Sequence, residues 1–164
     1  VPCPKCQHAE TMASHAEANQ QSAAYSEEHH LPLLKGTEKQ VAWANTIRKS
    51  MIEAVEKAVN PSDLMKESLA FVHRYSRKNG LPDIAEKAYA EDKYNAGKEA
   101  LLAYLQEKYE EGKAAFLEHL KVETKATYFI NMRNEVSREF GKYLVAAYYE
   151  KPLEEIGKVL DDMP

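Results

Sequence analysis

The sequence predicts an all-α protein, and three observations support this class. The 164 residues include only six glycines and seven prolines, and long stretches with neither are rich in the helix-forming residues Ala, Glu, Lys and Leu. Apolar residues recur at spacings of three and four, as they do on the buried face of a helix. No stretch shows the alternation of a strand. We expect four or five main helices in a bundle or an irregular orthogonal array.

The clearest predicted helix runs from about Glu38 to Val59. Gly36 interrupts the preceding segment, and Thr37 with Gln40 three residues later forms a capping-box pattern. Trp43, the only tryptophan, lies one residue off the apolar face of this helix. It is therefore either a core or rim aromatic residue or an exposed anchor for a partner. The predicted buried face consists of Val41, Ala44, Ile47, Met51 and Val55.

Further helices are expected over residues 60–79, 83–122, 123–149 and 153–160. Asn60-Pro61 is typical of a helix start, and Asn79-Gly80 is typical of a helix end. Gly97 and Gly112 interrupt the third range, so each could mark a bend or a break. Pro152 suits the start of the short last helix.

Residues 1–35 differ in composition from the rest of the chain. They contain both cysteines and four of the six histidines, and residues 8–28 could be helical. Leu31-Pro32-Leu33-Leu34 reads as an extended linker, because the residue before a proline is disfavoured in helical geometry. We therefore divide the chain into an N-terminal Cys/His segment with its linker, 1–35, and a helical domain, 36–164.

Cys3-Pro4-Lys5-Cys6 is the sharpest chemical motif. Two cysteines at this spacing can hold one zinc ion, and a structural zinc site needs four ligands. Two histidines of the same chain could complete it, or two chains could each give one cysteine pair, as a dimer would allow. The other interpretation is a reduced pair at a frayed terminus; a redox role lacks the βαβ pattern that usually surrounds it. The candidate histidines are His8, His15, His29 and His30.

Charge argues against the most obvious nucleic-acid functions. The net charge of -4 is too acidic for a dedicated DNA-wrapping protein and too weak for a DNA mimic. The densest basic cluster is Arg74, Arg77 and Lys78, together with His73. It lies near a predicted helix C-terminus, where the helix dipole already stabilises positive charge. Contact with nucleic acid through this cluster is therefore open but not favoured.

Two further arginines are candidate binding residues. Arg48 lies in the Trp43 helix and could pair with a carboxylate or with another anion. Arg133 lies within the apolar stretch 128–134, so we expect it to be partly buried and to need a carboxylate partner.

The sequence carries none of four common catalytic patterns. The chain has no phosphate-binding loop, dinucleotide fingerprint, HExxH metalloprotease motif or nucleophile elbow, so no catalytic residue is assigned. Glu27 and His30 form one ExxH pair, whereas a carboxylate di-iron bundle needs two. No apolar stretch approaches the length of a membrane span. Two cysteines at one end suggest a reducing, cytoplasmic setting.

Residues 36–48, GTEKQVAWANTIR, resemble a segment of uncharacterised bacterial, phage and plasmid proteins. In those proteins a Gly-Ser/Thr-x-Lys-Gln run precedes Trp-Ala and Ile-Arg, and a later helix carries an aromatic pair, an Ile and an Arg. YFINMR, residues 128–133, looks like that later segment, although Phe129 and Met132 depart from it. The resemblance implies a mobile-element origin and packing of the two helices against each other. It implies no activity.

These observations favour a non-enzymatic interaction or regulatory protein that binds another protein. Ten tyrosines against four phenylalanines suit a surface that is both apolar and wet. The first alternative is a zinc-containing nucleic-acid-binding module, and the second is an enzyme with an unrecognised helical active site. The candidate partner-binding residues are Trp43, Arg48, Arg74, Arg77, Lys78 and Arg133.

Overall fold

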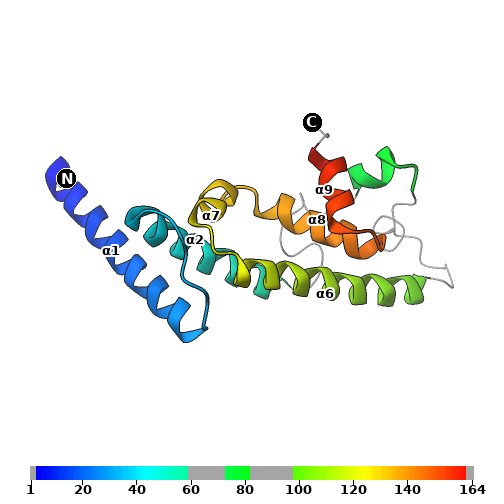
Figure 1. The fold of residues 1–164 in the computed structure, drawn as a ribbon, viewed down its shortest axis with the longest axis horizontal. Coiled ribbons are helices and arrows are strands. Elements are labelled where there is room, and N and C mark those ends of the chain that lie inside the picture. Colours follow the sequence, from blue (N-terminus) through cyan, green and yellow to red (C-terminus); the bar gives the residue numbers. More distant parts are fainter. Residues whose placement is uncertain (1–2, 59–72, 82–97, 162–164) are drawn as a thin grey trace. The chain divides into compact units, whose positions relative to one another are not determined.

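The computed structural model describes residues 3–58, 73–81 and 98–161. Its described residues form helices and no β-strand, which confirms the all-α class (Figure 1). The chain divides into two compact units, one made of residues 1–53 and 120–134 and the other of residues 54–119 and 135–164. Each unit is described by itself below. No helix among the described residues is long and apolar enough to cross a membrane.

The first unit begins with α1 (Pro4–Glu28), which starts earlier than the sequence indicated. Cys3 is the N-cap residue, and its Sγ accepts a hydrogen bond from the backbone N–H of Cys6 at 3.3 Å. Pro4 occupies the first helical position, where its missing N–H is not needed. The Cys-x-x-Cys motif is therefore the first turn of a helix.

Helix α2 (Glu38–Lys57) starts where the capping box predicted. The Thr37 backbone N–H donates to Gln40 Oε1 at 3.0 Å, and the Gln40 N–H donates to Thr37 Oγ1 at 3.2 Å. Small polar side chains join α1 to α2. Ser22 Oγ donates to Thr46 Oγ1 at 3.0 Å, and Thr46 Oγ1 donates to Asn19 Oδ1 at 3.2 Å.

The buried face of α2 is rotated from the predicted one. Val41 and Ile47 are only half-buried, whereas Arg48 and Ile52 are buried. The reason is that the Arg48 guanidinium finds hydrogen-bond acceptors inside the unit, so a charged residue occupies a core position that the predicted apolar face left out. The buried residues of α2 are Ala44, Arg48, Met51, Ile52 and Val55.

The linker after α1 pairs with the start of α7 (Ala126–Met132). The Lys35 N–H donates to Thr124 O at 2.7 Å, and the Ala126 N–H donates to Lys35 O at 3.0 Å. Gly36 lies at this approach, since a Cβ there would lie 3.1 Å from the Ala126 Cβ. The linker is thus held against α7.

The structure divides the helix predicted over 123–149 into α7 and α8 (Val136–Tyr148). Arg133 donates to the carbonyl of Ile130, which satisfies a backbone group at the end of α7. Asn134 follows in a turn, a position that asparagine favours, and Glu135 leaves helical geometry with φ −118° and ψ 18°. The helix therefore stops and starts again, which the apolar spacing did not reveal.

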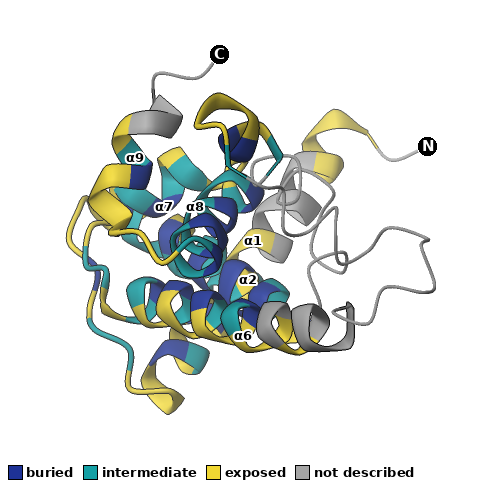
Figure 2. Cartoon of the chain, turned by 90° about the vertical axis from the view of Figure 1, so that its right-hand side faces the viewer, coloured by how far each residue is buried: buried dark blue, intermediate teal, exposed yellow. Residues whose placement is uncertain are grey.

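The second unit contains α6 (Lys98–Val122) up to His119, together with α8 and α9 (Leu153–Asp161). α8 runs alongside α6 in Figure 1, and Figure 2 shows buried residues along one side of α6. An aromatic cluster fills this contact: Phe140 lies 5.8 Å from Tyr109 and 5.6 Å from Phe116 between ring centroids. Such ring pairs contribute beyond their buried area.

Gly112 is a contact point and not a break in α6. The helix continues through it, and a Cβ there would lie 3.0 Å from the Tyr143 carbonyl oxygen of α8. α9 begins directly after Pro152, as predicted. In the described residues 73–81, Tyr75 is buried and Gly80 ends the helical turn with φ +62°. The predicted helix start at Asn60-Pro61 and the predicted interruption at Gly97 lie outside the described residues.

Candidate functional site

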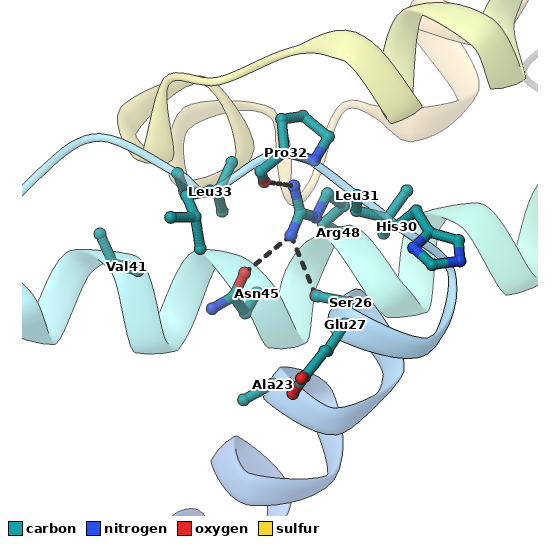
Figure 3. A pocket seen from close by; sticks show the side chains of 11 residues that line it. Ala23, Ser26, Glu27, His30, Leu31, Pro32, Leu33, Val41, Asn45 and Arg48 are labelled. Carbon is teal, nitrogen blue, oxygen red and sulfur yellow. Dashed lines mark hydrogen bonds between the residues drawn. The ribbon is translucent and has the colours of Figure 1, made fainter.

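Arg48 is the centre of the candidate site, in the first unit. It is 1% exposed, and its guanidinium makes three hydrogen bonds (Figure 3). Nη1 donates to the Pro32 carbonyl at 2.8 Å, while Nη2 donates to Ser26 Oγ and to Asn45 Oδ1, both at 2.9 Å. The arginine therefore joins the end of α1, the linker and α2 through one side chain.

All three acceptors are uncharged. No carboxylate among the described residues forms an ion pair with Arg48, and its buried Nε has no hydrogen-bond partner. Burial lowers the pKa of the guanidinium, although an arginine in a protein stays protonated. Phe129 of α7 offers only weak compensation, with its ring centroid 5.9 Å from the guanidinium carbon. The site thus holds a buried positive charge without a counter-charge.

A cavity of about 650 Å³ lies beside this guanidinium. Figure 3 shows its walls coming from the end of α1, the linker and α2. One acidic side chain, Glu27, and one histidine, His30, also border it. The apolar wall residues are Ala23, Leu31, Pro32, Leu33, Leu34 and Val41.

Trp43 and Arg133 form an exposed pair in the same unit. The Trp43 side chain is 48% exposed, and the Arg133 guanidinium carbon lies 5.1 Å from its ring centroid. Arg133 is exposed and stacks on an aromatic face, so the expectation that it would be partly buried beside a carboxylate is wrong. Its side chain comes from the end of α7, where the helix stops and solvent is close. Because both contacts join α2 to α7, the predicted packing of these two helices is confirmed.

Cys3 and Cys6 lie together and exposed at the start of α1. Their Sγ atoms are 2.8 Å apart, and hydrogen bonding to the Cys6 thiol and backbone lowers the pKa of Cys3. His29 and His30 follow the far end of the same 25-residue helix, about 37 Å away at 1.5 Å per residue. His15 lies along α1 between them. Within the described residues no group of three or more His, Cys, Asp or Glu side chains could hold a metal ion.

The basic cluster lies in the second unit and not with Arg48. Arg74, Arg77 and Lys78 are exposed among the helical residues 73–78, just before Gly80. Of the predicted partner-binding residues, the structure therefore brings together Trp43 and Arg133. Arg48 lies in the same unit at a separate site, and the other three lie in the second unit.

Sequence reasoning missed the cavity. Asn45 precedes Arg48 by three residues, so their contact is a helical neighbour pair that the spacing could have indicated. Ser26 and Pro32 are 22 and 16 residues away, and no local pattern connects them to the arginine. The chain matches no protein-family model, no curated protein and no solved structure.

Proposed function

We propose that this is a non-enzymatic interaction protein, regulatory in role, that binds another protein through the surface around Trp43 and Arg133. The observation that supports this is the half-exposed tryptophan with an arginine stacked on its ring. Tryptophan and arginine are the residues that most often dominate the energy of a protein interface. The pair is also held in place by two helices, so little side-chain freedom is lost on binding.

The surroundings of Trp43 suit an interface of ordinary anatomy. A cavity of about 790 Å³ lies beside it, bordered by Ala18 and Ala42 and by polar side chains that include Asn19, Glu38 and Lys39. An aromatic residue with polar neighbours is common at interfaces. The partner we expect presents an apolar side chain to Trp43 and a carboxylate to Arg133. We further propose that it meets this protein in the cytoplasm.

The test is affinity capture from the source cell, followed by titration with the purified partner. Wild-type protein and a Leu153→Ala control, which changes an exposed apolar residue of the second unit, should capture the same partner. Trp43→Ala should weaken binding at least about tenfold, and Arg133→Ala should weaken it less. Equal capture by the Trp43→Ala variant would exclude this surface as the interface.

A second candidate function rests on the paired thiols. We propose a structural zinc site formed by Cys3 and Cys6 of two chains, in a dimer that binds nucleic acid. The close, exposed thiols at a helix start support the metal site. Metal analysis of protein prepared without chelator should then find about one zinc per two chains, lost in Cys3→Ser with the helical circular dichroism retained. Zinc-free protein would remove this candidate.

A further inference from the structure

We propose that the cavity beside Arg48 binds a carboxylate carried on an apolar group. The group is either a small free organic acid or the C-terminal carboxylate of a polypeptide. This site is separate from the Trp43 surface, and its test does not depend on a partner for that surface.

The Arg48 guanidinium is a buried charge with unused hydrogen-bond donors. A guanidinium has five N–H donors, and the three hydrogen bonds of Arg48 leave two, of which the buried Nε–H has no acceptor. Removing one charge from water without a counter-ion is unfavourable. A carboxylate is the partner whose planar geometry and charge match a guanidinium best. Arg48 is one of the residues that line the cavity, so a carboxylate bound there would lie beside the uncompensated charge.

The walls of the cavity indicate what else the ligand carries. Leu31, Pro32 and Val41 line the cavity with apolar surface, and its volume is in the range of small-molecule sites. Leu33, at the same cavity, is 91% exposed. An apolar chain attached to the carboxylate would cover this leucine and remove its surface from water. The combination of one cation with apolar walls therefore favours an apolar acid over a highly charged anion such as a nucleotide.

Glu27 should make the cavity select ligands with a single negative charge. Glu27 borders the cavity and is exposed, and it makes no ion pair with Arg48. Its negative charge weakens the binding of any anion, and it weakens the binding of a ligand with two negative charges further. We therefore expect one carboxylate to be accepted and dicarboxylates to be rejected. His30 also borders the cavity.

The experiment is a titration of the full chain with octanoate, followed by the backbone amide resonances of an isotope-labelled sample. Octanamide, which has the same chain without the charge, is the matched control. A short peptide ending in a free leucine carboxylate and the same peptide amidated form the second arm and distinguish the two sources. Binding of either acid but not of its amide, with shifts confined to residues 23–34 and 41–48, supports the proposal. Equal binding of acid and amide, shifts elsewhere, or no binding in either arm would overturn it.

Three substitutions make the result independent of whether Arg48 variants fold. Glu27→Gln removes the repelling charge from an exposed position, so it should tighten binding of the acid about two- to fivefold. Leu33→Glu places a negative charge at the exposed leucine and should weaken binding relative to the matched Leu33→Gln. If Arg48 has only a structural role, neither the charge at position 27 nor the charge at position 33 should change the affinity for the acid. Unchanged affinity in Glu27→Gln together with equal affinities of the two Leu33 variants would therefore also overturn the proposal.

Discussion

Arg48 shows how a charged residue can take a structural position in the core. It occupies a core position on α2, where an apolar residue would satisfy the periodicity, and it uses that position to bind three uncharged acceptors. Shortening the side chain would remove all three hydrogen bonds, and losing hydrogen bonds from a charged donor is unfavourable. The arginine therefore stabilises the joint between α1, the linker and α2 although its charge is not balanced.

We predict that Arg48→Ala lowers the free energy of unfolding by about 2–4 kcal/mol, because it removes hydrogen bonds from a charged donor and leaves a cavity. Urea denaturation measures this difference. Arg133→Ala is the control: it removes an exposed arginine whose contact with the Trp43 ring is worth about 0.5–1 kcal/mol. Similar losses in the two variants would contradict the contrast between a buried and an exposed arginine.

A second prediction at this scale concerns Cys3. Hydrogen bonding to the Cys6 thiol lowers the pKa of Cys3, so its thiolate is present at a lower pH than in an ordinary thiol. The rate of alkylation of Cys3 by iodoacetamide, followed by mass spectrometry, should accordingly reach half its maximum below the usual thiol pKa. Cys6→Ala removes the thiol partner and should move this midpoint up. An unchanged midpoint in the variant would show that Cys6 does not tune Cys3.

Helices are specified locally in this chain, but their contacts are not. The capping box at Thr37 and Gln40 and the proline before α9 act within a few residues, so the helix starts follow from sequence. Gly112 is different. Its lack of a Cβ matters only because α8 packs against α6 there, and the residue that it faces, Tyr143, lies far along the chain. A glycine in a helix can therefore mark a close contact just as well as a bend.

We predict opposite effects for two glycine substitutions. Gly112→Ala should lower the free energy of unfolding by about 0.5–2 kcal/mol, because the new Cβ would crowd the Tyr143 carbonyl at 3.0 Å and overpacking outweighs the gain in helix propensity. Gly157→Ala, in α9, meets no atom within 4 Å and should raise it by about 0.4–1 kcal/mol. Thermal unfolding compares the two. A stabilising Gly112→Ala would mean that α8 can shift to accept the methyl group.

At the scale of the whole molecule, the distribution of charge bears on nucleic-acid binding. The net charge is -4, and the basic cluster of Arg74, Arg77 and Lys78 lies where a helix end already favours cations. The residues of the Arg48 cavity and of the Trp43 surface belong instead to the first unit. These two sites and the most basic segment therefore belong to different units.

We predict no appreciable binding of duplex DNA or RNA near physiological salt. Nucleic-acid binding depends on cations that neutralise phosphates, so a real interaction would weaken steeply as salt rises. A gel-shift titration of wild type and of a variant with Arg74, Arg77 and Lys78 all changed to Gln decides this. Submicromolar, salt-sensitive binding that the triple variant loses would favour the zinc-containing nucleic-acid-binding alternative.

The sequence by itself determined the helical class and the starts of α2 and α9, because these depend on composition, spacing and capping within one or two helical turns. It also indicated that α2 packs on α7, which the contacts of Arg48 with Phe129 and of Arg133 with Trp43 bear out. Sequence spacing did not show the break between α7 and α8.

Only the tertiary structure decided which arginine is buried. From spacing alone, Arg133 within an apolar stretch looked partly buried, whereas Arg48 was only a residue that could pair with an anion. The structure exposes Arg133 and buries Arg48, because acceptors that keep Arg48 inside come from Ser26 and Pro32, which only folding brings to α2. A buried charge depends on partners that are distant in sequence, and a local pattern carries no information about them.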